Sequence, residues 1–328
     1  MPHPGADPVD HLLALDPGAR GIGKFFQPGG ALRAARALRR ARRVLIATGF
    51  VVDSGRTETD GPPGAAALGR ALRALGAEVA YITDAVTAPV LGAALSALGE
   101  PAGVITWPGG AEAAPRVLAA ARPTHLVAIE RPGRARDGVY RNMRGVDVSD
   151  WNPPLDDLFV LAARTARTAR TDRTGVRSHA HLEQATRGTS RPRGPRYNKI
   201  PVGRTPNRMI TIGVGDGGNE IGMGNVRARL TRGGGLAARI VSTVRVDHLV
   251  VAGVSNWGAY GIVAQLGRLA GRPLLHTPDD ERRLVTACVD AGACDGVTRK
   301  PEPTVDGLPL ETHAAMVALL SVAAGRRS

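Results

Sequence analysis

Residues 209–225 read MITIGVGDGGNEIGMGN, and this stretch decides the fold class. Met209–Val214 is an apolar run of strand length without alternating polar positions, which is typical of a strand buried on both faces of a parallel sheet. The following loop contains five glycines, together with Asp216 and Glu220. Because glycines let the backbone and a ligand approach closely, the loop predicts a functional site at the end of a buried strand.

The same alternation of strands and helices extends to both sides of this stretch. Further strands are predicted at Val44–Phe50, Glu78–Thr83, Val104–Trp107, His125–Glu130, Asp247–Ala252 and Pro273–His276. Helices are predicted at Gly30–Arg43, Pro63–Gly76, Ala111–Ala121, Gly258–Gly271, Asp279–Gly292 and Leu310–Ala324. Such alternation builds a mainly parallel sheet with helices on both faces. The sequence therefore predicts an α/β fold, in which residues 1–328 form one enzyme domain or two lobes.

A basic segment at about 162–208 interrupts the pattern. It is rich in Arg, Thr, Pro and Ser, and between Arg164 and Arg208 it has 12 Lys or Arg against two acids, so it carries +10 of the formal charge of +14. A nucleic-acid-binding arm is one interpretation, but Tyr197 is the only aromatic residue available for stacking on bases. We therefore favour a solvated insert and expect no nucleic-acid partner.

Several other classes of protein are excluded by composition. The two cysteines form no metal or redox motif, and no apolar run of about 18 residues predicts a membrane span. The N-terminal residues Met1–Asp10 lack the basic start and apolar stretch of a signal peptide. We expect a cytoplasmic protein that binds no membrane, and a homo-oligomer remains open.

Acidic side chains follow four of the predicted strands. They are Glu58 and Asp60, Asp84, Glu130, and Asp216 with Glu220. Ligands of parallel α/β sheets collect at the C-terminal ends of the strands, so these acids are expected to converge there. Crowded carboxylates need a shared cation or proton, and oxygen ligands suit Mn²⁺ or Mg²⁺. Asp84 alone is better explained as a helix cap or turn former.

The same loop also has features of a dinucleotide-binding site. Gly213–Gly218 has the G-x-G-x-x-G spacing after a strand. However, Asp216 would put a negative charge where a pyrophosphate should lie, and no acid follows about 20 residues later. No P-loop and no G-x-S-x-G motif is present, so no nucleotide cofactor is expected.

Six motifs stand out: ETDGP (58–62), ER-G-RA-DG-Y-NMRG (130–145, with dashes at unmatched positions), IGVGDGGNEIGMGNV (212–226), AGVSNWGAYG (252–261), DGVT (295–298) and TVDGL (304–308). Together they resemble the D-glutamate cyclase family, over roughly residues 16–310. The resemblance implies a hydro-lyase that converts D-glutamate, a small acidic substrate, to 5-oxo-D-proline with loss of water. A manganese-dependent phosphatase acting on a small phosphate ester, or a catalytically inactive ligand-binding relative, is the alternative.

Cyclisation suggests a role for each polar group in these motifs. The catalytic candidates are Asp216, Glu220 and Glu130. The candidate ligands of a divalent cation, which would polarise the γ-carboxyl group, are Glu58, Asp60, Asp216 and Glu220. The candidates for binding the substrate are Arg131, Arg141, Arg144, Asn219, Ser255 and Asn256. Asn256 is also a candidate N-cap for the predicted helix at Gly258–Gly271.

Overall fold

The computed structural model describes residues 7–53, 55–101, 103–165 and 208–325. Its centre is a six-stranded sheet in the order β5-β4-β1-β6-β7-β8, and every neighbouring pair is parallel. The strands are β5 (Val104–Thr106), β4 (Glu78–Thr83), β1 (Arg43–Thr48), β6 (His125–Ile129), β7 (Ile210–Gly215) and β8 (His248–Val251). Two short antiparallel pairs lie outside this sheet: β2 (Val51–Asp53) with β3 (Arg56–Thr57), and β9 (Thr304–Val305) with β10 (Leu308–Pro309). The predicted α/β class and parallel sheet are confirmed.

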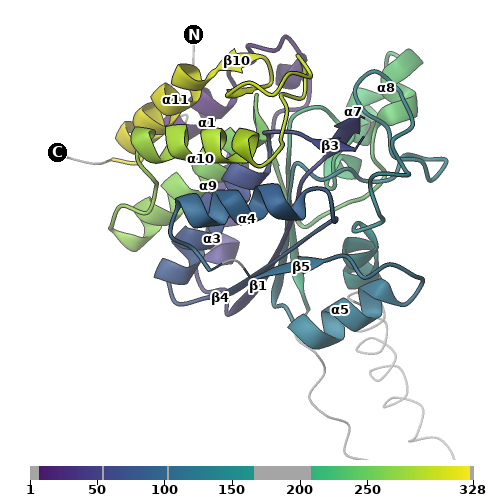
Figure 1. Ribbon diagram of the computed structural model, residues 1–328, viewed down its shortest axis with the longest axis horizontal. Coiled ribbons are helices and arrows are strands. Elements are labelled where there is room, and N and C mark those ends of the chain that lie inside the picture. The colour runs from purple at the N-terminus through teal and green to yellow at the C-terminus, as the bar shows by residue number, and fades with distance from the viewer. Residues whose placement is uncertain (1–6, 54, 102, 166–207, 326–328) are drawn as a thin grey trace, which may run out of the picture.

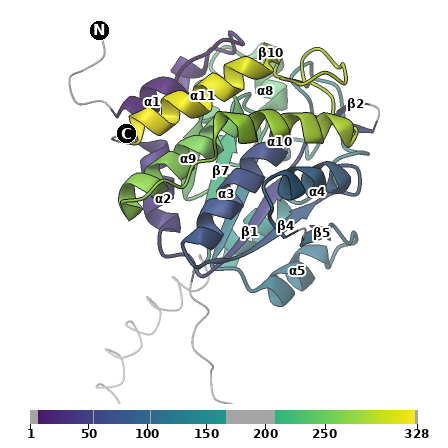
Figure 2. The same ribbon diagram turned by 60° about the vertical axis from the view of Figure 1, so that its left-hand side comes forward.

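Helices cover both faces of the sheet (Figures 1 and 2). Strand β1 shows why, since Val44 and Ile46 pack into one buried cluster while Leu45 and Ala47 pack into the other. The first cluster takes its other residues mainly from α1 (Pro8–Leu13), α2 (Gly30–Leu38), α3 (Pro62–Ala74), α4 (Ala88–Ala97), α9 (Ser255–Ala270), α10 (Pro278–Asp290) and α11 (Leu310–Ala323). The second is covered by α5 (Ala113–Ala121), helical residues 157–165, η1 (Ile22–Lys24) and η2 (Met223–Asn225).

Two short helices, α7 (Arg227–Leu230) and α8 (Gly235–Ile240), follow the glycine-rich loop and lie next to each other in Figure 1. Among the described residues, no helix is long and apolar enough to cross a membrane.

Four sequence predictions need correction. The helix predicted at Gly30–Arg43 ends at Leu38, and Arg43 instead begins β1. Residues 273–276 form no strand, because Leu274 and Leu275 reach the helical core as loop residues. Helix α9 begins at Ser255 and not at Gly258, so Asn256 lies inside the helix and is not its N-cap. Residues 162–165, predicted to open the insert, still belong to the helix that starts at residue 157. Residues 166–207 of the predicted insert lie outside the described residues.

Candidate active site

The glycine-rich loop after β7 folds back over its own strand. A β-carbon at Gly213 would lie 2.4 Å from the backbone oxygen of Ile221, so this close approach requires glycine. Glu220 closes the loop by accepting hydrogen bonds from the backbone N–H groups of Asp216 (3.2 Å), Gly217 (2.6 Å) and Gly218 (2.7 Å). Both of its carboxylate oxygens are therefore engaged inside the loop, and Asp216 is held at the C-terminal end of β7.

The N-terminus of α9 meets the acids that follow the neighbouring strands. The backbone N–H of Ser255 lies 2.9 Å from an Asp60 oxygen and 3.2 Å from an Asp216 oxygen. The backbone N–H of Asn256 donates to Asp60 at 2.8 Å, and the Ser255 hydroxyl donates to Glu130 at 2.5 Å. A helix N-terminus carries partial positive charge, so α9 stabilises carboxylates at this point.

Asp216 is common to two groups of carboxylates that could hold a metal ion. One group is Asp60, Asp216 and Asp306, and the other is Glu130, Asp216 and Glu220; within each, one oxygen per residue lies within 4.8 Å of the others. We call the five residues the acid cluster. Oxygen donors this close together suit a hard divalent cation.

Burial and mutual repulsion change the pKa values in the acid cluster. Burial and the charge of Asp306 raise the pKa of Asp60 to about 7, against the opposing effects of the Asn256 and Ser255 backbone N–H groups and of Arg20. Burial and the charges of Asp216 and Glu220 raise the pKa of Glu130 well above its usual range. Burial likewise raises the pKa of Asp216, against the opposing effect of Arg20. The cluster therefore retains protons at neutral pH unless a further cation joins it.

Arg20 is the cation that the structure places at the acid cluster. Its guanidinium pairs with Asp216 and, at 2.6 Å, with Asp306. Burial would lower the pKa of Arg20, but the charges of Asp216 and Asp306 outweigh burial and keep it above its usual value. Sequence reasoning missed Arg20, because nothing in residues 18–24 marks it as a partner of positions 216 and 306.

Asp306 was missed as a site residue as well, although a signal for it exists. Asp306 and Gly307 form the two-residue turn between β9 and β10, with φ angles of 56° and 76°. Asp-Gly is a preferred pair for such a turn. One oxygen of Asp306 is buried without a hydrogen-bond partner among the described residues, which leaves it free to bind a ligand.

The three arginines predicted to bind substrate have other partners. Arg131 is fully buried and pairs with Asp84, while its guanidinium also donates to the backbone oxygen of Gly49 at 2.9 Å. Arg141 pairs with Asp137 at 2.7 Å. Arg144 donates to the backbone oxygen of Val297 at 3.2 Å. A direct substrate contact by Arg131 would require it to leave a buried ion pair.

The remaining predicted residues lie at or near the acid cluster. The side-chain oxygen of Asn256 accepts hydrogen bonds from the backbone N–H groups of Gly61 (2.9 Å) and Gly64 (2.8 Å), which fixes the start of α3 beside α9. Asn219 donates to the backbone oxygen of Arg141 at 2.7 Å. Burial, followed by the charges of Asp306 and Asp60, raises the pKa of Glu58 well above its usual range, but Glu58 belongs to neither metal-capable group.

Comparisons with known proteins give one family. The family model described as "D-glutamate cyclase-like, C-terminal" matches residues 9–176 and 200–321. The human (Homo sapiens) protein "D-glutamate cyclase, mitochondrial" is 32% identical over 356 aligned positions, which cover 94% of this chain and 50% of the human protein. The chain thus spans about half the length of the curated relative that it matches.

One solved structure shows a weak likeness in shape. The crystal structure of exonuclease RecJ bound to manganese aligns with 79% of this chain and 42% of its own chain, at 13% identity and a TM-score of 0.33. A likeness at this level carries no argument about the metal or the reaction.

Proposed function

The chain belongs to the D-glutamate cyclase-like family, and from this premise we propose that it cyclises D-glutamate to 5-oxo-D-proline with loss of water. The observation that carries the proposal is the acid cluster itself, in which buried carboxyl groups of raised pKa face one arginine. Both features correspond to requirements of the reaction.

The reaction must move two protons from nitrogen to oxygen. The α-ammonium group of D-glutamate loses two protons to become the lactam N–H, and the departing γ-oxygen gains two protons to leave as water. A buried carboxyl group whose pKa is raised can hold a proton in the folded protein and pass it to a departing oxygen. We assign this role to Glu130, because the Ser255 hydroxyl orients it and its raised pKa lets it hold a proton.

The positive and negative groups of D-glutamate match the acid cluster on one side of the site and the basic residues on the other. The α-ammonium group is attracted to the acid cluster, and the two carboxylates to Arg20 and Lys24. Arg20 and Lys24 line the same cavity. The Lys24 Nζ atom lies next to Gly21, the residue after Arg20, at 3.8 Å from the position that a β-carbon on Gly21 would take. A guanidinium beside the γ-carboxylate drains its negative charge and makes its carbon a better electrophile.

A divalent cation also fits the acid cluster. The donors are all carboxylate oxygens, and one Asp306 oxygen is buried and unpartnered among the described residues. Asp60, Asp216 and Asp306 would hold Mn²⁺ or Mg²⁺, which would supply Lewis-acid polarisation of the γ-carboxyl group. Glu220, predicted as a ligand, would first have to give up hydrogen bonds within its own loop.

Metal binding should be visible without any assay of activity. Mn²⁺ or Mg²⁺ at about 100 times its Kd is expected to add about 3 kcal/mol to the free energy of unfolding, which calorimetry detects as a higher Tm. The Asp306→Asn variant should lose most of this shift, and asparagine tolerates the positive φ at this turn. Asp290→Asn, at an exposed position, should keep the shift. Equal shifts in all three proteins, or none with either metal, would contradict this site.

Product analysis tests the proposed reaction. D-glutamate, L-glutamate and a generic phosphate ester are each incubated with the protein, with and without chelator, and 5-oxoproline and phosphate are measured. Formation of 5-oxo-D-proline from D-glutamate supports the cyclase. Release of phosphate alone would support the phosphatase, and binding without turnover would support an inactive relative. A cytoplasmic location, a homo-oligomer and the lack of a nucleic-acid partner remain predictions from sequence.

His313 connects helix α9 to the β9–β10 turn, and this contact leads to a further prediction. The Trp257 Nε1–H donates to His313 Nδ1 at 3.0 Å, so the proton of the neutral ring lies on Nε2, which donates to the Val305 backbone oxygen at 3.2 Å. Burial keeps the pKa of His313 below its usual value, in agreement with a neutral ring. Through this ring, α9 holds the β9–β10 turn that carries Asp306.

His313→Leu is expected to lower kcat about 10-fold, because Asp306 loses its fixed position. The buried Trp257 N–H also loses its partner, at a cost of about 1–3 kcal/mol in the free energy of unfolding. Steady-state kinetics and denaturant unfolding measure the two effects. His313→Gln should recover much of both, since an amide can accept from Trp257 and donate to Val305, and the exposed His11→Leu serves as control. A normal kcat in His313→Leu would show that the histidine does not position Asp306.

A further inference from the structure

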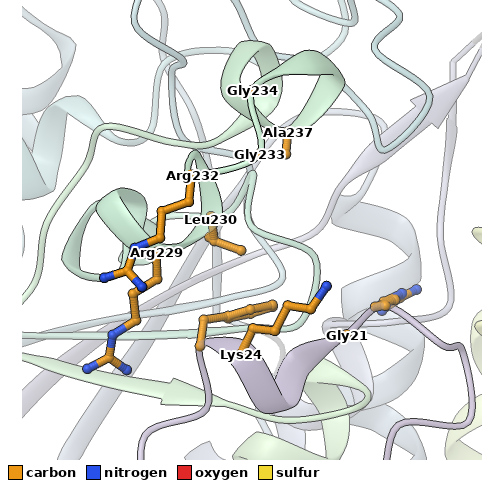
Figure 3. Close-up of a pocket in the computed structure, with 10 residues that line it drawn as sticks. Gly21, Lys24, Arg229, Leu230, Arg232, Gly233, Gly234 and Ala237 are labelled. Atoms are coloured by element: carbon orange, nitrogen blue, oxygen red, sulfur yellow. The ribbon is translucent and has the colours of Figure 1, made fainter.

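A cavity of about 630 Å³ lies beside Arg20, the residue that pairs with two acids of the cluster (Figure 3). Its lining includes the basic residues Arg20, Lys24, Arg229 and Arg232 and the apolar residues Phe25 and Leu230. Arg20 belongs to this lining and also pairs with Asp216 and Asp306. A ligand that reacts at the acid cluster can therefore extend past Arg20 into the cavity.

The cavity carries more positive charge than the chain itself balances. Four of its ten lining residues are basic. Arg20 has acidic partners, but among the residues that the structure describes, Lys24, Arg229 and Arg232 form no salt bridge. In Figure 3, Arg229 and Arg232 lie on the α7 side of the cavity, across from Lys24. Lys24, Arg229 and Arg232 are exposed, so water screens their mutual repulsion, but their shared positive charge attracts an anionic ligand to the cavity.

D-glutamate alone does not account for this cavity. Its two carboxylates are matched by Arg20 and Lys24, which leaves Arg229 and Arg232 without a role. A volume of about 630 Å³ also lies in the range of sites for much larger ligands, about 300–1,000 Å³. The apolar side chains of Phe25 and Leu230 offer contact for carbon atoms that D-glutamate lacks.

We propose that the cavity receives the leaving group of a larger substrate, a γ-D-glutamyl conjugate of an acidic amine such as an amino acid. This inference rests on the proposed function and names its substrate class. The carboxylates of the leaving amine pair with Arg229 and Arg232, while the D-glutamyl unit lies at the acid cluster. The planar guanidinium groups of the two arginines suit carboxylates, which they bind through paired hydrogen bonds. They hold the leaving group on the side of the reacting carbon that faces away from the acid cluster.

The step balances without a co-reactant. The lone pair of the α-nitrogen attacks the γ-carbonyl carbon, the new N–C bond closes the lactam, and the bond from the γ-carbon to the conjugate nitrogen breaks. Two protons pass from the α-nitrogen to the departing nitrogen, which leaves as an ammonium group. The products are 5-oxo-D-proline and the free amino acid. The carbon attacked is that of an amide and not of a carboxylate, so less negative charge opposes the attack.

The test compares three substrates with purified full-length protein. They are γ-D-glutamyl-L-glutamate, D-glutamine, whose leaving nitrogen carries no carboxylate, and free D-glutamate; an enzyme-free blank corrects for spontaneous cyclisation. We expect kcat/KM for the conjugate to exceed that for D-glutamine by about 10²-fold, with 5-oxo-D-proline and L-glutamate formed in equal amounts. The double variant Arg229→Gln/Arg232→Gln should bring the conjugate to within about threefold of D-glutamine.

The same variant separates this inference from the proposed function. Cyclisation of D-glutamate should stay within about twofold of the parent in the double variant, and exposed Arg239→Gln should change neither reaction. If D-glutamate is cyclised while the conjugate is not, or if the double variant turns over the conjugate as fast as the parent, the inference is wrong and the function stands. If neither compound is cyclised, both are wrong. Turnover of the conjugate but not of D-glutamate would support the inference and overturn the proposed substrate.

Discussion

The Asp216→Asn variant is expected to lose about 10³-fold or more in kcat/KM for D-glutamate cyclisation while keeping its fold. Asp216 belongs to both metal-capable groups and pairs with Arg20. Asparagine has the same shape, but it carries no charge to hold a cation or the guanidinium. The loss should therefore appear in kcat as well as in KM, because both positioning and charge stabilisation depend on this residue.

The stability of this variant provides the matching control. Burial raises the pKa of Asp216, so the ionised side chain is costly in the folded state, and Asp216→Asn should unfold at the same Tm as the parent or at a higher one. Circular dichroism should be unchanged, and exposed Asp290→Asn should retain full activity. A well-folded Asp216→Asn protein that cyclises D-glutamate as fast as the parent would remove Asp216 from the mechanism.

Arg20→Gln is expected to show the second large effect, on both activity and stability. Removal of the guanidinium leaves buried Asp216 without its cation, which costs about 3–5 kcal/mol in the free energy of unfolding. It also removes the proposed partner of the γ-carboxylate, so kcat/KM should fall about 10²–10³-fold. Denaturant unfolding and steady-state kinetics measure these losses separately.

The stability loss in Arg20→Gln should depend on pH with a definite sign. Folding raises the pKa of Asp60 from 3.8 to about 7, so the folded state binds more protons than the unfolded state between these values. Stability contributed by such a group is present at low pH and is lost as pH rises through this window. Loss of Arg20 strengthens this decrease in stability with rising pH. The difference in Tm between Arg20→Gln and the parent should therefore be large at pH 8 and small at pH 5.

A double variant makes the coupling explicit. Asp216→Asn should raise stability more in the Arg20→Gln background than in the parent, because it then removes an unpaired buried charge, yet the double variant should stay inactive. Equal effects of Asp216→Asn in the two backgrounds would show that the two side chains do not interact in the folded protein, contrary to their ion pair.

The sequence predicted the sheet well because its strands are short apolar runs between glycines, prolines and helices. It failed at residues 273–276, where Leu274 and Leu275 pack in the helical core without pairing with any strand. It placed the start of α9 too late because Gly258 suggested a boundary. Gly258 instead lies within α9, where a β-carbon would approach Val214 of β7 to 2.5 Å.

The position of the candidate site was predictable where polar residues directly follow a strand. Asp216 and Glu130 each lie at the C-terminal end of a buried strand, so the geometry of parallel sheets brings them together. Arg20 could not be predicted, since its partners are about 200 and 290 residues away in sequence and no local pattern encodes such contacts. Glu220 looked like a ligand, but three backbone N–H groups of its own loop bind it.

The most direct test of the central claim is a proton NMR time course of D-glutamate with the parent protein and with Asp216→Asn side by side. The parent should convert the amino-acid signals to those of 5-oxo-D-proline, L-glutamate should stay unchanged, and Asp216→Asn should leave D-glutamate intact over the same period. Equal conversion by both proteins, or no conversion by the folded parent with Mn²⁺ or Mg²⁺ present, would contradict a cyclase centred on the acid cluster.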